Sequence, residues 1–311
     1  MRQRSLDCVY ELACRDPRVV FVGSDLGPGT LDQMKTEMPD RFYMEGVSEQ
    51  AIVGLAAGLA MEGHIPYVNT IAPFFTRRAF EQVAVDLCLH QLPVRLIANG
   101  GGLVYAPLGP THLAIEDIAA LRSIPNMTIV APCDAEEMSR FMPCTLDWPG
   151  PIYIRLGKGV DAVVSRPEDG FAIGRAIIRG TPGEVLIVTT GIGLRGALEA
   201  ASDLAREGLG CGIIHMHTLK PFDRRAVLDN LQGVRLLVTL EEHTLAGGLG
   251  SMVLETIADA GTTVWPRVLR LGVPDVFPKE YGTQESMMDT FQLSATHVVS
   301  AVRSRMSELR H

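Results

Sequence analysis

The chain has 311 residues and a net charge of −8; 47% of its residues are apolar and 21% are charged. This is the composition of a globular protein and not of a disordered one. The acidic balance argues against a nucleic-acid-binding surface, because phosphate groups require clustered Lys and Arg. A chain of this length exceeds one ordinary core, so we expect two domains of roughly 150 residues each.

The first sixteen residues, MRQRSLDCVYELACRD, contain no uninterrupted apolar stretch, so no secretory signal is predicted. The apolar run at 51–61 is too short to cross a bilayer, which takes about 20 residues. Six cysteines without a CxxC spacing are typical of reduced thiols and not of a disulfide framework or metal site: Cys8, Cys14, Cys88, Cys133, Cys144 and Cys211. We therefore expect a soluble, cytoplasmic protein with no membrane contact.

Short β-branched runs alternate with longer helical patterns through the first half of the chain. Strands are predicted at 18–25 (RVVFVGSD), 65–71 (IPYVNTI), 93–99 (PVRLIAN), 127–132 (MTIVAP) and 151–157 (PIYIRLG). Helices are predicted at 50–61 and 77–90. Alternation of strand and helix predicts a parallel sheet covered on both faces.

A polar, turn-rich segment at 163–182 follows, which we interpret as a linker, and the alternation then restarts. Strands are predicted at 184–191, 211–218 and 235–243, and helices at 194–207, from about residue 224, and after GGLGS at 247–251. The predicted fold class is α/β, with two doubly wound domains and mostly parallel sheets. The domains are expected at 1–162 and 183–311.

A glutamate opens the small-residue helix predicted at 50–61. Ala51, Gly54, Ala57 and Gly58 form one small face, although a mid-helix Gly costs about 1 kcal/mol relative to Ala. Glu49 has two interpretations from this stretch alone. It favours the helix dipole by roughly 0.3–1 kcal/mol, or it is a buried functional acid.

Several ordered motifs carry a family resemblance. VSEQAIVGLAAGLAMEG (47–63), GPTH (109–112) followed by an acid, LRSIPN (121–126), and VTLEEHTLAGGLGSMVLE (238–255) with LGVPD (271–275) stand in the order found in transketolases. The chain resembles the transketolase superfamily over nearly all of residues 5–305. It is also similar to 1-deoxyxylulose-5-phosphate synthase and to the beta subunit of pyruvate-dehydrogenase-type enzymes.

The resemblance implies thiamine diphosphate as cofactor, with Mg²⁺ or another divalent cation. Glu49 matches the glutamate that hydrogen-bonds the cofactor's aminopyrimidine ring and so helps to remove the proton from the reactive thiazolium carbon. Phe75 matches the aromatic residue that stacks on the aminopyrimidine. Ala72 stands where the family often has a second aromatic residue, and Phe74 has the wrong offset to replace it.

The resemblance also implies substrate contacts. His112 of GPTH matches a histidine that faces the substrate hydroxyl near the reacting carbon, where a neutral imidazole can donate or pass a proton. Arg155 matches an arginine that binds the substrate phosphate through its bidentate fork. Arg78 matches a position near the substrate channel, and its neighbour Arg77 is expected at the surface.

Two further segments have less specific matches. Asp25 and Leu26 match a loop at the end of the first strand that approaches the cofactor from a dimer partner, and a plain turn with Asp as a cap explains them equally well. His215 and His217 would share one face of a strand, which could suggest a metal pair. The sequence shows no third ligand, so a structural role is favoured and no metal site is predicted within this chain.

The chain lacks one expected feature, the GDG motif with a downstream Asn that holds Mg²⁺ on the diphosphate. The resemblance therefore implies that a separate N-terminal, diphosphate-binding transketolase subunit supplies this part and holds the cation. We expect an α2β2 heterotetramer with sites at the interfaces between chains.

The loop NGGG at 99–102 also departs from the family pattern. Gly100 and Gly101 stand where relatives that bind phosphorylated sugars often carry His, Asp or Arg, and Leu108 stands where Asp is common. Glycine lets backbone approach a ligand but offers no charge. We place both glycines in the substrate site and expect a sugar that is less phosphorylated, more apolar, or bound by the partner.

The leading interpretation is the C-terminal subunit of a split transketolase, which transfers a two-carbon ketol unit from a ketose to an aldehyde. A 2-oxo acid dehydrogenase beta subunit and a 1-deoxyxylulose-5-phosphate synthase-like enzyme are alternatives. An inactive homologue kept as an interaction or regulatory module is an alternative of another class. The presence of Glu49, Phe75 and His112 argues against this last possibility.

Overall fold

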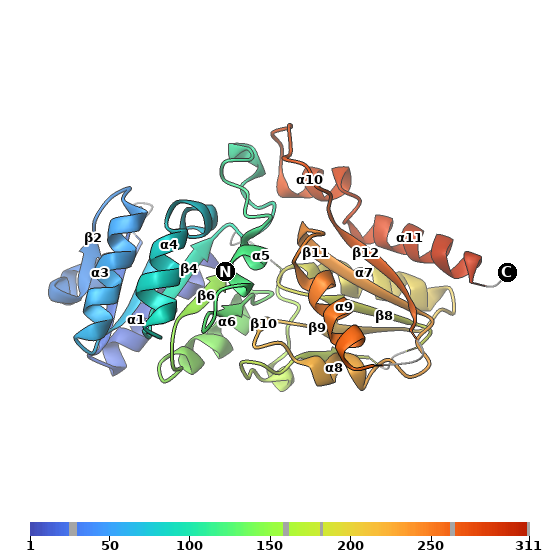
Figure 1. The fold of residues 1–311 in the computed structure, drawn as a ribbon, viewed down its shortest axis with the longest axis horizontal. Helices are drawn as coiled ribbons and strands as arrows, with labels where there is room; N and C mark the ends of the chain where they lie inside the picture. The colour runs from blue at the N-terminus through green and yellow to red at the C-terminus, as the bar shows by residue number, and fades with distance from the viewer. Residues whose placement is uncertain (25–29, 158–161, 181–182, 262–264, 310–311) are drawn as a thin grey trace.

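The computed structural model describes residues 1–24, 30–157, 162–180, 183–261 and 265–309. Two β-sheets lie side by side along the long axis of the molecule, and helices cover both faces of each (Figure 1). The predicted fold class is confirmed. No helix within the described residues is long and apolar enough to cross a membrane.

The first domain is built on a seven-stranded sheet in the order β10-β5-β6-β4-β3-β1-β2. Its strands are β1 Val19–Gly23, β2 Phe42–Met44, β3 Ile65–Ile71, β4 Arg95–Asn99, β5 Thr128–Val130, β6 Ile152–Arg155 and β10 Thr218–Lys220. All neighbours are parallel except β10 and β5. The register pairs Gly23 with Asn69 and Ile71 with Asn99, so the carboxyl ends of β1, β3 and β4 meet at one edge, where ligands bind in such sheets.

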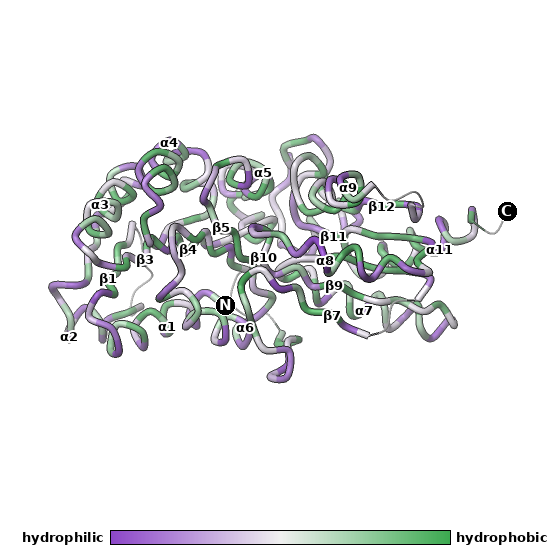
Figure 2. Tube along the Cα trace, turned by 60° about the horizontal axis from the view of Figure 1, so that its bottom comes forward, coloured by the Kyte–Doolittle hydropathy of each residue, from purple (hydrophilic) through white to green (hydrophobic). Residues whose placement is uncertain are grey.

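Helices cover this sheet in two layers. One layer holds α1 Arg2–Arg15 and α6 Ala135–Phe141, and the other holds α3 Glu49–Met61, the π-helical turns η2 Phe74–Arg78 and η3 Val83–Leu89, α4 Phe80–Gln82 and α5 Asp117–Arg122 (Figure 2). The smaller helices are α2 Asp32–Glu37 and the 3-10 turns η1 Pro39–Arg41, η4 Ala106–Leu108 and η5 Met142–Thr145. Both faces of the sheet are therefore buried, as its near-continuous apolar strands require.

The second domain has a five-stranded sheet in the order β12-β11-β8-β9-β7. Its elements are β7 Ile177–Arg179, β8 Val185–Thr189, α7 Gly193–Arg206, β9 Cys211–His215, α8 Arg224–Leu228, β11 Leu236–Thr244, α9 Leu249–Asp259, β12 Arg267–Val273, α10 Gln284–Thr290 and α11 Ala295–Glu308. Alternate residues of β8 and β11 point to opposite faces. One set packs on α7 and α11, and the other on α8 and α9.

Two predicted segments differ from the structure. The segment at 163–182 is not only a linker, because it includes the 3-10 turn η6 Pro167–Asp169 and strand β7, which pairs antiparallel with β9. A three-residue strand is too short for its alternation to show among turn residues. The helix predicted at 77–90 is instead the succession η2, α4 and η3. A π turn holds more residues than an α turn, so side chains rotate away from the positions that a 3.6-residue period predicts.

Candidate functional site

Glu49 is the first residue of α3, and its carboxylate is buried, with 1% of the residue exposed. The Thr70 hydroxyl donates to Glu49 Oε1 at 3.3 Å, and the Ser24 hydroxyl donates to Thr70 Oγ1 at 2.8 Å. Thr70 lies on β3, and Ser24 follows β1. The carboxylate is thus held at the edge where the carboxyl ends of two parallel strands meet a helix N-terminus, which is where ligands bind in such sheets.

A cavity of about 120 Å³ opens on this carboxylate. Its wall combines apolar side chains with a few polar ones, which is typical of ligand sites: Arg2, Ser24, Val47, Glu49, Thr70, Ile71, Phe74, Asn99 and Tyr105. Asn99 is buried, and its Nδ2 donates to Asn69 Oδ1 at 3.2 Å, while Asn99 Oδ1 has no hydrogen-bond partner within the described residues. A buried amide oxygen without a partner in a cavity wall indicates a place for a hydrogen-bond donor of a ligand.

The structure places the aromatic residues differently from the sequence prediction. Phe75 has no exposed surface and packs in the core with Val68, Val83 and Leu96. Phe74 is the residue that lines the Glu49 cavity. The π-helical turn η2 explains the difference, because its wider turn rotates Phe74 toward the cavity and Phe75 toward the sheet. The structure therefore does not bring Phe75 to the site, and its stacking role stays a prediction.

One chain of contacts joins Glu49 to His112. Arg78 Nη1 lies 2.5 Å from Glu49 Oε2, and the Arg78 guanidinium carbon lies 4.2 Å from the centroid of the Phe74 ring. The Phe74 ring meets the His112 imidazole edge to face at 5.4 Å between centroids. His112 lines a second, more open cavity of about 530 Å³, which Phe74 also lines. Phe74 therefore stands between the Glu49 cavity and the His112 cavity.

Arg77 anchors the loop that carries His112 and is not simply a surface residue. Its guanidinium donates to the carbonyl oxygens of Pro110 and Leu113 at 3.1 and 2.9 Å and pairs with Glu116. The sequence pattern could not show this role, because all of these partners lie more than thirty residues away. Arg77 fixes the GPTH segment against η2.

The NGGG loop approaches its neighbours as closely as glycine allows. A Cβ at Gly100, where φ is +79°, would lie 2.0 Å from the Tyr105 ring, and one at Gly101 would lie 2.5 Å from Arg155. The Tyr105 ring thus fills the space beside Gly100 and lines the Glu49 cavity. Leu108 is exposed at the tip of the loop. The two glycines lie beside the site but present no side chain to it.

Arg155 does not form an open phosphate site in this structure. Its side chain is buried, its Nε donates to Asp117 Oδ2 at 2.7 Å, and its Nη2 donates to the carbonyl oxygens of Ala114 and Glu242 at 3.1 and 2.9 Å. Burial alone lowers the pKa of Arg155, but the charge and hydrogen bond of Asp117, together with the nearby Tyr153 and Glu242, outweigh burial and raise the pKa. The guanidinium links the two domains. The N–H groups that could bind a phosphate are used here for contacts within the chain.

Asp25 and Leu26 lie outside the described residues.

His215 and His217 are both buried, and the structure brings further groups to His215 that the sequence did not reveal. His215 Nε2 lies 3.0 Å from Glu137 Oε2, and Cys133 Sγ completes a group close enough to hold a metal ion. Burial alone raises the pKa of Glu137, but its electrostatic interaction and hydrogen bond with His215, together with His217 and the Cys133 backbone N–H, outweigh burial and lower the pKa to about 2. Glu137 Oε2 also accepts the Cys133 backbone N–H at 2.6 Å, so the group forms a hydrogen-bonded contact between the domains, while Glu137 Oε1 and His215 Nδ1 have no hydrogen-bond partner within the described residues.

The comparisons with known proteins agree with the arrangement of the domains. Residues 1–160 match the family "Transketolase, pyrimidine binding domain", and residues 174–298 match "Transketolase, C-terminal domain". The chain is 33% identical over 302 residues to the 6-deoxy-6-sulfo-D-fructose transketolase subunit SqwH of Clostridium sp. (strain MSTE9), with 97% of this chain and 92% of that protein covered. It is 35% identical to one subunit of the apulose-4-phosphate transketolase of Phocaeicola vulgatus, with 88% and 87% covered.

Longer relatives match over part of their length. The chain is 37% identical to the 1-deoxy-D-xylulose-5-phosphate synthase of Synechococcus sp. (strain JA-3-3Ab), and it spans 46% of that protein. Among solved structures, a split-gene transketolase described as an inactive beta4 tetramer superposes with a TM-score of 0.87 at 34% identity, covering 97% of this chain and 96% of that one. A transketolase from Pichia stipitis shares the fold at a TM-score of 0.76 and 19% identity, and this chain covers 46% of it. The chain belongs to the transketolase superfamily and comprises its pyrimidine-binding and C-terminal domains.

Proposed function

We propose that this chain is the C-terminal, beta-type subunit of a two-component transketolase that depends on thiamine diphosphate. The reaction would transfer a two-carbon ketol unit from a ketose donor to an aldehyde acceptor. The observation that carries the proposal is the buried Glu49 carboxylate at the wall of a small cavity, at the start of a helix. Membership of the transketolase family, whose enzymes use this cofactor with a divalent cation, supports it.

The residues around the cavity fit the aminopyrimidine half of the cofactor. A flat ring with polar edges needs an apolar face and a few hydrogen-bonding groups at its rim. Ile71, Val47 and the Phe74 ring offer apolar surface, while Glu49 and the unpaired Asn99 Oδ1 offer acceptors among the described residues. When bound, the cofactor supplies a carbanion that attacks a carbonyl carbon and holds the electrons after the C–C bond breaks.

Glu49 would hold a proton at the ring edge of the cofactor. The Thr70 hydroxyl fixes one carboxylate oxygen, and Arg78 fixes the other. In a site with little water a positioned carboxyl group of this kind contributes typically 10²–10⁴-fold to a proton transfer. His112, in the adjoining cavity, would face the substrate and donate to, or pass a proton from, its hydroxyl groups.

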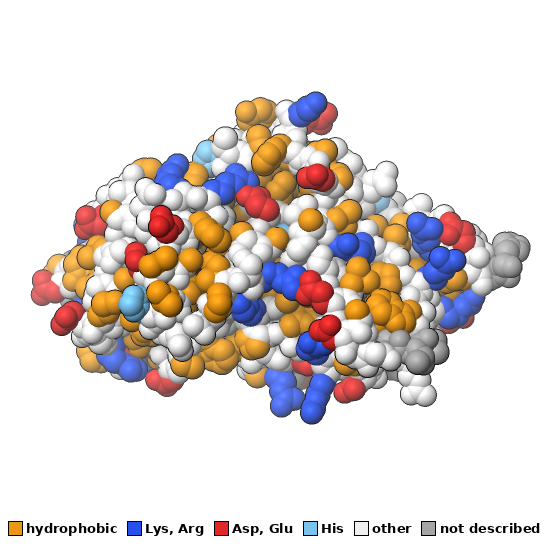
Figure 3. Space-filling view, in the orientation of Figure 1, with side chains coloured by type: hydrophobic (Ala, Val, Ile, Leu, Met, Phe, Trp, Pro, Cys, Tyr) orange, Lys and Arg blue, Asp and Glu red, His pale blue; other side chains and the backbone are white. Residues whose placement is uncertain are grey.

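A partner subunit is part of the proposal. Apolar side chains gather over α3, α4 and η3 (Figure 3), where Met61, Phe80, Val85 and Leu89 are each at least 36% exposed. Exposed apolar surface of this kind marks an interaction site. We propose that the N-terminal, diphosphate-binding subunit completes the site and holds Mg²⁺ or another divalent cation, within an α2β2 heterotetramer. The relatives named as transketolase subunits support a two-chain enzyme.

The proposed substrates are small sugars. The two subunit relatives are named for 6-deoxy-6-sulfo-D-fructose and apulose-4-phosphate, which are sugars that carry an anionic group. In this chain Arg77, Arg78 and Arg155 all have partners within the chain, whereas Arg2 lines the Glu49 cavity. We propose that the chain itself recognises hydroxyl groups of the sugar and that, apart from Arg2, any phosphate contact comes from the partner.

The test begins with native purification of the chain from its host and mass spectrometry of what co-purifies. We expect a near-equimolar chain that carries GDG with a downstream Asn, and turnover of a ketose donor when the two purified chains are mixed with thiamine diphosphate and Mg²⁺. Turnover of pyruvate with glyceraldehyde 3-phosphate would favour the 1-deoxyxylulose-5-phosphate synthase-like alternative. Capture by a lipoyl domain would favour the 2-oxo acid dehydrogenase alternative. Failure to bind the cofactor with any such partner would favour the inactive homologue.

A further inference from the structure

The loop between β4 and α5 carries much of the proposed site. It includes Tyr105 in the wall of the Glu49 cavity and His112 in the wall of the second cavity. Its two ends are tied to each other, since the Gly102 N–H donates to the Ala114 carbonyl at 2.9 Å and the Ala114 N–H donates to the Gly102 carbonyl at 3.2 Å. The segment 103–113 between these ties has little regular structure beyond the 3-10 turn η4, so other contacts must hold it in place.

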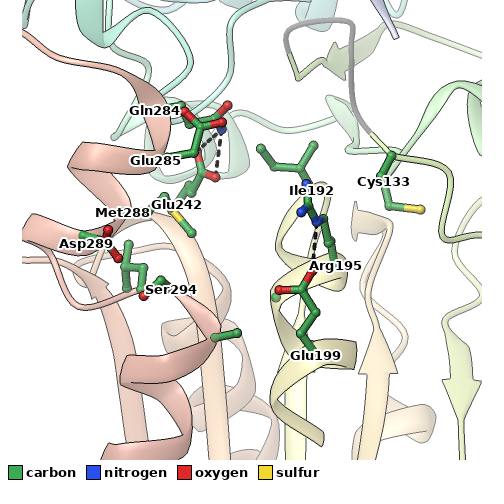
Figure 4. A pocket seen from close by; sticks show the side chains of 14 residues that line it. Cys133, Ile192, Arg195, Glu199, Glu242, Gln284, Glu285, Met288, Asp289 and Ser294 are labelled. Carbon is green, nitrogen blue, oxygen red and sulfur yellow. Dashed lines mark hydrogen bonds and ion pairs between the residues drawn. The ribbon is translucent and has the colours of Figure 1, made fainter. Parts of the chain in front are cut away.

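The second domain supplies such a contact through Glu242, near the end of β11. Glu242 Oε2 accepts the backbone N–H of Leu103 at 3.0 Å, across the domain boundary. Gln284, the first residue of α10, donates from Nε2 to both carboxylate oxygens of Glu242 at 2.9 Å (Figure 4). Glu242 is buried. A buried carboxylate that accepts several hydrogen bonds has a fixed orientation, and hydrogen bonds to a charged acceptor are stronger than those between neutral groups.

The backbone at Gly102, in the first domain, packs directly against the side chain of Glu242. Gly102 has φ of +71°, and a Cβ there would lie 2.6 Å from Glu242 Oε2 and 2.7 Å from Glu242 Cβ. Only glycine allows both this backbone conformation and this approach. The backbone carbonyl of Glu242 also accepts the Arg155 guanidinium at 2.9 Å, so both the main chain and the side chain of Glu242 bind the first domain.

We infer that Glu242, held by Gln284, is a positioning residue that sets the loop 103–113, and with it Tyr105 and His112, for the reaction of the first domain, from the Leu103 end of the loop, while Arg77 holds the other end through Pro110 and Leu113. This role deepens the proposed function and rests on it for its catalytic consequence. It also gives the second domain a part in the site, although none of its described residues lines the Glu49 cavity or the His112 cavity. Glu242 and Gln284 line a separate cavity of about 310 Å³ between α7 and α10 (Figure 4).

The experiment is hydrogen–deuterium exchange of the full chain, followed by mass spectrometry. In Glu242→Ala we expect the peptide that covers 103–113 to exchange about 10- to 100-fold faster, as loss of a hydrogen bond to a charged acceptor predicts, while peptides of α1 and β3 keep the wild-type rate. Glu242→Gln keeps an acceptor oxygen and should restore most of the protection. Gln284→Leu, at the half-buried start of α10, keeps the Leu103 contact and should give an intermediate rate if Glu242→Ala does not fold. Glu199→Ala is the control, because Glu199 lines the same 310 Å³ cavity but pairs with Arg195.

Unchanged exchange of 103–113 in both Glu242→Ala and Gln284→Leu, or faster exchange spread over the whole chain, would overturn the inference. In the reconstituted pair, kcat should fall at least about tenfold in Glu242→Ala and recover in Glu242→Gln. The exchange experiment needs no turnover, so it tests the role of Glu242 separately from the proposed function. A wild-type pair without turnover contradicts the proposed function, whereas a wild-type pair with turnover and an unaffected loop contradicts only the role of Glu242.

Discussion

Arg78 and Glu49 form an ion pair of 2.5 Å in which the carboxylate is buried and the arginine side chain is 44% exposed. The pair joins the acid of the Glu49 cavity to the turn that carries Phe74, on which the same guanidinium stacks. Arg78 therefore contacts the proposed proton-holding group directly, whereas the sequence predicted only a place near the substrate channel. A bound cofactor would have to share Glu49 with this arginine.

A double-mutant cycle measures this pair. Arg78→Met leaves the buried Glu49 carboxylate without its partner, so we expect the free energy of unfolding to fall by about 1–2 kcal/mol, less than for a fully buried pair because water screens Arg78. In the background of Glu49→Gln the same change should have little effect, which gives a coupling of about 1 kcal/mol in chemical denaturation. Equal effects of Arg78→Met in both backgrounds would show that the pair is not coupled. Arg77→Met offers a matched control, since Arg77 pairs with Glu116 instead.

The adjacent phenylalanines should separate binding from stability. Phe75→Ala removes a fully buried ring, so we expect the free energy of unfolding to fall by about 3–5 kcal/mol. Phe74→Ala should change stability much less but weaken thiamine diphosphate binding to the reconstituted pair about threefold to tenfold, because the lost stacking is worth about 0.5–1.5 kcal/mol. Calorimetry of binding and of unfolding checks both. If Phe75→Ala folds normally and loses the cofactor, the family match is right and the position seen in the isolated chain is not that of the complex.

Arg155 should behave as a structural residue. Arg155→Met leaves the buried Asp117 carboxylate without its ion-pair partner, so we expect the free energy of unfolding to fall by about 3–5 kcal/mol. Variants that still fold, such as Arg155→Lys, should keep the wild-type ratio of kcat/KM between phosphorylated and unphosphorylated ketoses. A selective loss of the phosphorylated substrate would restore the phosphate-binding role that the sequence predicted.

Glu241 should make stability depend on pH. Burial raises its pKa from 4.5 to about 7, against the hydrogen bonds from the backbone N–H groups of Leu249 and Gly250 at the start of α9. The folded state binds the Glu241 proton more tightly than the unfolded state does. The contribution of protonated Glu241 to the free energy of unfolding is therefore fully present below about pH 4.5 and is lost as pH rises through 7. The difference between the pKa of Glu241 in the folded and in the unfolded state corresponds to roughly 3 kcal/mol of unfolding free energy. We expect the slope of unfolding free energy between about pH 5 and 7 to become shallower in Glu241→Gln, and an unchanged slope would assign the effect to another group.

The sequence predicted the strands of both sheets well where apolar runs were long, as in β1, β3, β4, β8 and β11. It missed β2, β7, β10 and β12, which are the edge strands of the two sheets, because short or edge strands depend on partners far along the chain. Near the site it identified Glu49 and His112 from motifs. It could not show that η2 turns Phe74 rather than Phe75 to the cavity, since a π turn has no simple sequence signal. Nor could it show the contacts of Arg155 and Glu242, which join the domains across more than eighty residues.

The most direct test of the whole account is a calorimetric titration of thiamine diphosphate, with Mg²⁺ present, into three samples. These are the chain alone, the chain with its co-purified GDG-bearing partner, and the same pair carrying Glu49→Gln, with Glu62→Gln at the opposite end of α3 as a control. The account predicts no measurable binding to the chain alone and binding near one cofactor per chain pair in the complex. When a ketose donor and an aldehyde acceptor are then added to the same samples, turnover should be at least about 100-fold lower in Glu49→Gln but near wild type in Glu62→Gln. Saturable binding to the chain alone, or full turnover in Glu49→Gln, would contradict it.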